Sequence, residues 1–105
     1  MVTLCGANAY QKKYYLNPDF EVLPTKIKQE LQILCVVFTE QAGGMITLSF
    51  DEDGTLLIRT SCNEEDILYD DISAGLLVRE LRNEKAELFE ELELYYKIMT
   101  EGLSE

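Results

Sequence analysis

The feature that most constrains this sequence is the stretch Asp71–Glu101, which covers nearly a third of the chain without a proline. Within it, apolar side chains recur at alternating spacings of four and three residues, the repeat of a helix packed lengthwise against another helix. We call the following eight positions the seam: Ala74, Val78, Leu81, Lys85, Leu88, Leu92, Tyr95 and Met99. The seam predicts a long C-terminal helix over about residues 71–100.

The length of this helix poses a packing problem. Thirty helical residues span about 45 Å, whereas a compact chain of this size has a radius of gyration of about 13 Å. The helix therefore either kinks near Arg82-Asn83, its most polar point, or packs along a second copy of the chain. We favour the second solution, a homodimer with the seam as its interface.

The start of the helix is ambiguous in the sequence. Asn63 is a good N-cap residue and precedes an acidic run that suits the positive end of a helix dipole. A second start lies near Asp70 or Ser73. The sequence leaves open whether one helix or two follow Asn63.

A shorter helix is predicted over residues 24–42, where apolar residues recur every three or four positions. Additional apolar side chains at Ile33, Val36 and Val37 widen this stripe. We therefore expect the helix to be largely buried at its C-terminal end. Gly43-Gly44 then supplies a stop signal.

A β-hairpin is predicted from residues 45–50 and 55–61, which alternate around an Asp-Glu-Asp-Gly turn. A three-residue loop with Gly54 in the left-handed conformation sets Phe50 opposite Leu56 and places the apolar residues on one face. A two-residue loop would set Phe50 opposite Leu57 and mix the two faces. We predict the first register, with the second face toward solvent.

The first 23 residues show no sustained periodicity, and we interpret them as a short N-terminal arm (1–23) that covers the core. A short helix within this arm would place Tyr10 and Tyr14 on one face. Because a two-stranded hairpin is marginally stable alone, it needs support from a helix, from this arm or from a second copy. The sequence as a whole predicts a single α+β domain over residues 1–105.

Composition excludes several classes of partner. Twenty acidic and nine basic residues give a net charge of −11, which repels phosphate backbones and anionic lipid head groups. We therefore expect no binding to nucleic acid or membrane. Three widely spaced cysteines and the lack of a leader-like segment favour a reducing, cytoplasmic location.

Few side chains suggest catalysis. The chain has no histidine, which removes the commonest general base and metal ligand, and no glycine-rich phosphate-binding motif. We predict no cofactor and no metal site. Cys5, which precedes a glycine, is expected to be the exposed thiol, and Tyr10, Tyr14 and Tyr15 are the other candidates for lining a pocket.

Three stretches resemble a known family: CGANAYQKKYYLNPDF near the start, the hairpin with its DEDG turn, and LFEELELYYKI near the end. They are similar to a family of short acidic bacterial proteins known only as a domain of unknown function. The resemblance extends over almost the whole chain and implies one complete protein. It supplies no activity and no site residues.

These observations favour a non-enzymatic protein-interaction, adaptor or regulatory module that acts as a homodimer and binds another protein. The alternative is an enzyme or small-ligand binder that uses Cys5, the N-terminal tyrosines or paired carboxylates. A ligand site should gather those groups around one concavity, whereas an interaction protein should present an apolar surface.

Overall fold

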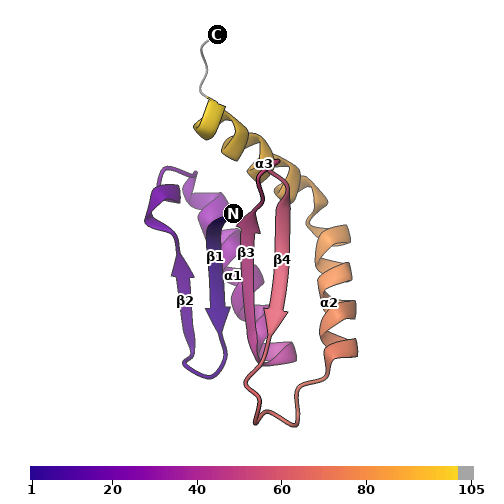
Figure 1. The fold of residues 1–105 in the computed structure, drawn as a ribbon. Helices are drawn as coiled ribbons and strands as arrows, with labels where there is room; N and C mark the ends of the chain where they lie inside the picture. The colour runs from indigo at the N-terminus through magenta and orange to yellow at the C-terminus, as the bar shows by residue number, and fades with distance from the viewer. Residues whose placement is uncertain (102–105) are drawn as a thin grey trace.

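The computed structural model of the chain describes residues 1–101, which form an α+β fold built on one antiparallel sheet. The sheet has the strand order β2-β1-β3-β4 (Figure 1). Along the chain the elements are β1 (Val2–Asn8), β2 (Lys13–Leu16), η1 (Pro18–Phe20), α1 (Thr25–Ala42), β3 (Met45–Phe50), β4 (Leu56–Ser61), α2 (Asp71–Glu84) and α3 (Ala86–Glu101). The predicted fold class is confirmed.

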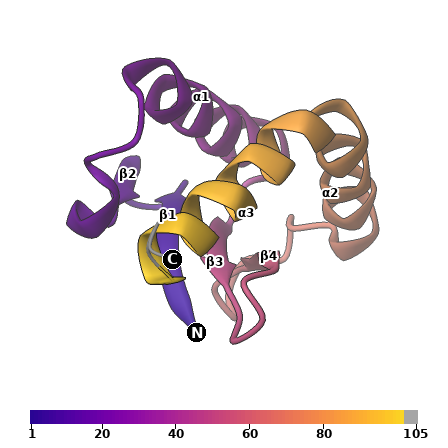
Figure 2. The same ribbon diagram turned by 90° about the horizontal axis from the view of Figure 1, so that it is seen from above.

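The helices form a single layer on one side of the sheet. Figure 2 shows α1 and α2 on the same side, with α3 crossing one end of the strands. The opposite face of the sheet, which faces the viewer in Figure 1, carries no helix. The fold thus has two layers, as expected for an antiparallel sheet with one buried and one open face.

The β3–β4 hairpin has the predicted register, with Phe50 opposite Leu56 and Leu48 opposite Ile58. Its turn closes through a hydrogen bond of 3.0 Å from the Asp51 amide to the Thr55 carbonyl. Gly54 has a φ of +84°, the left-handed conformation that this loop requires. The apolar residues of both strands consequently share the face that the helices cover.

The N-terminal segment is not an arm, and that prediction is wrong. It forms β1, β2 and the short 3₁₀ helix η1, and β1 lies between β2 and β3 in the middle of the sheet. Tyr10 lies in the turn between β1 and β2 and Tyr14 on β2, so they share no helix. The hairpin therefore obtains its support from two strands of its own chain.

The long C-terminal helix is divided at Lys85 into α2 and α3, two residues beyond the predicted kink. Hydrogen bonds run from the Lys85 amide to the Leu81 carbonyl and from the Phe89 amide to the Lys85 carbonyl, so the backbone ladder continues across the break. The helix begins after Asp70, whose carboxylate accepts hydrogen bonds from the backbone amides of Ile72 and Ser73. Of the two possible starts, Asp70 is the one used.

The core lies between the sheet and the helical layer. Phe50 of β3 stacks on Tyr96 of α3, with ring centroids 4.1 Å apart and an interplanar angle of 6°. Phe20 of η1 stacks on both rings. This aromatic group holds α3 against the end of the sheet at which β3 finishes.

Charge is distributed unevenly between the two layers. Within the described residues, none of the four strands contains an aspartate or glutamate, whereas the open face of the sheet carries Lys13 and Arg59. The carboxylates lie in the helices, turns and loops. The acidic surplus lies on α3 and in the turns and loops, whereas α1 and α2 carry nearly equal numbers of acidic and basic side chains.

Candidate functional site

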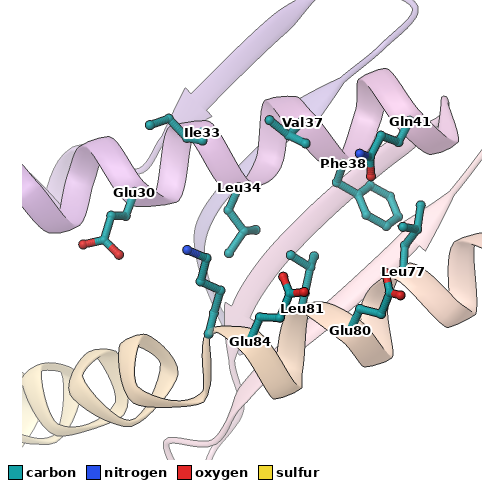
Figure 3. A pocket seen from close by; sticks show the side chains of 11 residues that line it. Glu30, Ile33, Leu34, Val37, Phe38, Gln41, Leu77, Glu80, Leu81 and Glu84 are labelled. Carbon is teal, nitrogen blue, oxygen red and sulfur yellow. The ribbon is translucent and has the colours of Figure 1, made fainter.

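The candidate site is a groove of about 360 Å³ between α1 and α2, on the helical side of the molecule. The two helices run in opposite directions along it (Figure 3). The groove is lined by Glu30, Ile33, Leu34, Val37, Phe38 and Gln41 from α1, Leu77, Glu80, Leu81 and Glu84 from α2, and Lys85 at the break between α2 and α3. We call this feature the α1–α2 groove.

The groove is apolar along its length. Leu34 and Phe38 point from α1 toward α2, and Leu77 and Leu81 point from α2 toward α1 (Figure 3). Leu34 and Phe38 are buried, while Leu77 and Leu81 are half-buried and pack against the core. The helices meet through these side chains, which form the floor.

The outer wall on α1 is also apolar and remains exposed. Ile33 is 62% exposed and Val37 is 41% exposed, although both belong to the widened stripe of α1. The predicted burial at the C-terminal end of α1 therefore holds for Leu34, Cys35, Phe38 and Thr39 and fails at Val37. The sheet covers one side of α1. Helix α2 covers only part of a second side, so the rest of the apolar stripe faces solvent.

Carboxylates line the rim of the groove. Glu30 lies toward one end, and Glu84 and Glu80 follow in turn along α2 (Figure 3). Lys85 is the cation among the lining residues. Within residues 1–101 the direct ion pair is Lys28–Glu21, at 3.2 Å, so Lys85 does not neutralise a rim carboxylate by contact.

The seam mostly faces the core of its own molecule. Ala74, Leu88 and Leu92 are buried in it. Val78, Leu81 and Tyr95 are partly buried against the same core. Lys85 lines the groove and Met99 is exposed. The break at Lys85 allows both halves of the seam to reach the sheet side, so burial of the seam does not require a second copy.

Cys5 and Tyr14 meet inside the protein, where Cys5 is fully buried rather than exposed. The Cys5 and Cys35 sulfurs are 3.8 Å apart. The neighbouring Cys5 thiol and burial raise the pKa of Cys35. Burial, together with these thiols, raises the pKa of Tyr14. The Cys35 thiol and the Tyr14 hydroxyl are therefore held in their neutral forms, which are poor nucleophiles.

The remaining tyrosine candidates lie elsewhere. The Tyr10 hydroxyl donates to the Asp66 carboxylate, which raises the pKa of Tyr10. It also accepts from the Asn63 amide at 3.1 Å, and the two hydrogen bonds tie the β1–β2 turn to the loop before α2. Tyr15 lies on the open face of the sheet, beside a shallow concavity of about 390 Å³ whose lining also includes Cys5 and Tyr14. Three of the four proposed pocket residues thus border one concavity, and Tyr10 lies outside it.

In residues 1–101, no three side chains among cysteine, aspartate and glutamate are grouped to hold a metal ion. None of the helices described here has the length and apolar character needed to cross a membrane.

The groove residues were missed at the sequence level because nothing marked them as a set. The widened stripe at Ile33 and Val37 was the available signal, and it was interpreted as burial. Glu30, Glu80 and Glu84 have the ordinary pattern of a solvated helix face. Only the approach of α1 to α2 brings these residues to one place.

Comparison with known proteins places the chain in a family. A family model described as "Family of unknown function (DUF6145)" matches residues 1–104. The chain belongs to the DUF6145 family. This agrees with the resemblance carried by the three stretches, while the DUF6145 description assigns no activity. No curated protein and no solved structure matches the chain.

Proposed function

We propose that this protein is a non-enzymatic protein-interaction module that works as an adaptor or regulator. The observation that supports the proposal best is the α1–α2 groove, whose apolar wall at Ile33 and Val37 stays exposed in the folded chain. Contiguous exposed apolar surface bordered by polar residues is typical of protein-binding sites.

The alternative, an enzyme or ligand binder built on the N-terminal residues, has less support. Its proposed thiol, Cys5, and the Tyr14 hydroxyl lie in the core, away from solvent-borne substrates. Tyr15 borders a shallow concavity that Cys5 and Tyr14 also line, while Tyr10 lies apart from it. Because the Cys5 thiol and the Tyr14 hydroxyl are covered there, Tyr15 is the exposed candidate in that concavity.

Site-specific photocrosslinking tests the proposal. Ile33 is replaced by the photoreactive residue benzoylphenylalanine in the cells that produce the protein, which are then irradiated. We expect a discrete adduct of higher mass from position 33. The matched control is the same residue at Ile67, which is more exposed than Ile33 and does not line the groove.

The control decides how an adduct is interpreted. An adduct formed at position 33 and absent at position 67 supports the proposal. Equal labelling at both positions, or no adduct at position 33, contradicts it, since mere exposure would then account for any crosslinking.

A further inference from the structure

We infer that the α1–α2 groove binds a cationic amphipathic helix of a partner protein. The inference rests on the proposed interaction function and goes further by naming the chemistry of the partner. Three properties of the groove support it, namely its shape, its apolar floor and the charge of its rim.

The shape fits a helix of about three turns. Glu30 and Gln41 mark the extent of the lining on α1, and the rise from one to the other corresponds to about 16 Å of helix. A third helix laid along two antiparallel helices contacts both of them through one face. Such helix-in-groove binding places anchors at positions i, i+3 or i+4, and i+7 of the bound segment.

The floor specifies apolar anchors. Leu77 and Leu81 offer partly exposed side chains in the middle of the groove, and Ile33 and Val37 extend this surface along α1. Burial of apolar surface stabilises a complex in rough proportion to the area removed from water. Leucine-sized side chains on one face of the partner would bury the exposed wall of α1.

The rim specifies positive charge on the flanks of the bound helix. Glu30, Glu80 and Glu84 outnumber Lys85, and the whole chain has a net charge of −11. Lysine or arginine side chains beside the apolar stripe of the partner would lie close to these carboxylates. An anionic partner would meet repulsion at the rim and from the rest of the molecule.

A second copy of the chain is a poor occupant of this groove. The exposed apolar residues of α3, Leu94 and Ile98, lie within one helical turn of carboxylates at Glu90, Glu91 and Glu101. Placing that face in the groove would bring carboxylates against the glutamate rim. Like charges placed together at an interface cost several kcal/mol.

Binding of designed peptides to the full chain tests the inference. The first peptide, about 14 residues long, carries leucines at helical i, i+3, i+4 and i+7 spacing and lysines on its other face. The second has the same composition in scrambled order, and the third replaces each lysine of the first with glutamate. Affinities come from fluorescence anisotropy, and the binding site from amide shifts in ¹⁵N-¹H NMR spectra.

We expect only the first peptide to bind tightly, with the largest amide shifts at residues 30–41 of α1 and 77–85 around α2. Its affinity should fall as salt is added, because exposed ion pairs are screened. Glu30→Gln, Glu80→Gln and Glu84→Gln together should weaken binding by about tenfold. The matched control neutralises the exposed Glu64, Glu65 and Glu90 and should leave the affinity within about twofold.

The apolar wall has its own pair of variants. Ile33→Ser with Val37→Ser should weaken binding by more than tenfold, whereas Ile67→Ser with Leu68→Ser should have little effect. All four residues are exposed, so each double variant should keep its fold. Circular dichroism checks that the variants fold like the unmodified chain.

The outcomes separate this inference from the proposed function. Equal binding of the scrambled peptide, equal weakening by the two charge variants, or shifts confined to the open sheet face would overturn the inference. Tight binding of the glutamate peptide in the groove would also overturn it, but would leave the interaction function in place. No peptide binding and no crosslink from position 33 would reject both.

Discussion

At the residue scale, Gly44 lies between α1 and β3 at a position that has no room for a side chain. Its φ is +66°, and an added Cβ would overlap the Ser61 carbonyl oxygen and the Tyr69 ring. Its own carbonyl accepts a hydrogen bond of 2.8 Å from the Ala9 amide. Gly75 differs in backbone conformation and in the space around it. It lies in α2, and nothing is close to the position that an added Cβ would take.

This contrast predicts opposite effects of the same substitution. Gly44→Ala should lower the free energy of unfolding by more than about 2 kcal/mol, because a left-handed backbone costs about 1–2 kcal/mol and steric overlap adds to it. Gly75→Ala should raise it by about 0.5–1 kcal/mol through helix propensity. Urea denaturation followed by circular dichroism measures both values, and effects of the same sign would contradict the prediction.

Glu93 is a residue whose role could not be predicted from local spacing. The i, i+4 spacing of Glu93 and Lys97 suggests a surface ion pair. Instead, the Glu93 carboxylate accepts a hydrogen bond of 2.8 Å from the Leu56 amide, and Arg82 donates to the Leu56 carbonyl at 3.4 Å. Both contacts satisfy backbone groups of an edge strand. They depend on the docking of α2 and α3, which local spacing does not encode.

At the element scale, the hairpin was predictable and the strand beside it was not. The β3–β4 pair keeps a strict period of two, so its register follows from placing Phe50 and Leu56 on one face. In β1 the register shifts between Thr3 and Cys5, and Leu4 lies at this bulge. A bulge adds one residue and breaks the alternation, so β1 lacked the pattern by which strands are recognised.

The attachment of α3 depends on the aromatic group at the end of the sheet. Tyr96→Ala removes the ring that stacks on Phe50 and contacts Phe20, and should lower the free energy of unfolding by about 2–3 kcal/mol. Leu94→Ala on the same helix is the control, because Leu94 is 58% exposed and its loss should cost less than about 0.5 kcal/mol. Similar denaturation midpoints for the two variants would show that the stack does not hold α3.

At the scale of the whole molecule, the break at Lys85 resolves the length problem only in part. The radius of gyration is 14.2 Å, slightly above that of a compact chain, and the longest dimension is 52 Å against 24 Å for the other two. The sequence indicated that a straight helix would overshoot. It placed the kink near Arg82-Asn83 because polarity was the local signal, whereas packing of both halves on the core determines the position.

The homodimer stays a prediction, but we now expect its interface on a surface other than the seam. The seam is largely used within the chain, whereas Ile72 and Leu76 of α2 are 77% and 55% exposed. We expect size-exclusion chromatography with light scattering to give twice the chain mass of 12.0 kDa. Ile72→Asp with Leu76→Asp should return it to the mass of one chain. A single-chain mass for the unmodified protein at micromolar concentration would contradict the prediction.

The separation of charge between the two layers has a consequence for how the molecule meets a partner. The rim of the α1–α2 groove carries Glu30, Glu80 and Glu84, whereas the open sheet face carries Lys13 and Arg59. A cationic partner is therefore attracted to the rim and repelled by the open sheet face. Productive encounters with the α1–α2 groove should therefore be more frequent than random orientation allows, and their association rate should fall as ionic strength rises.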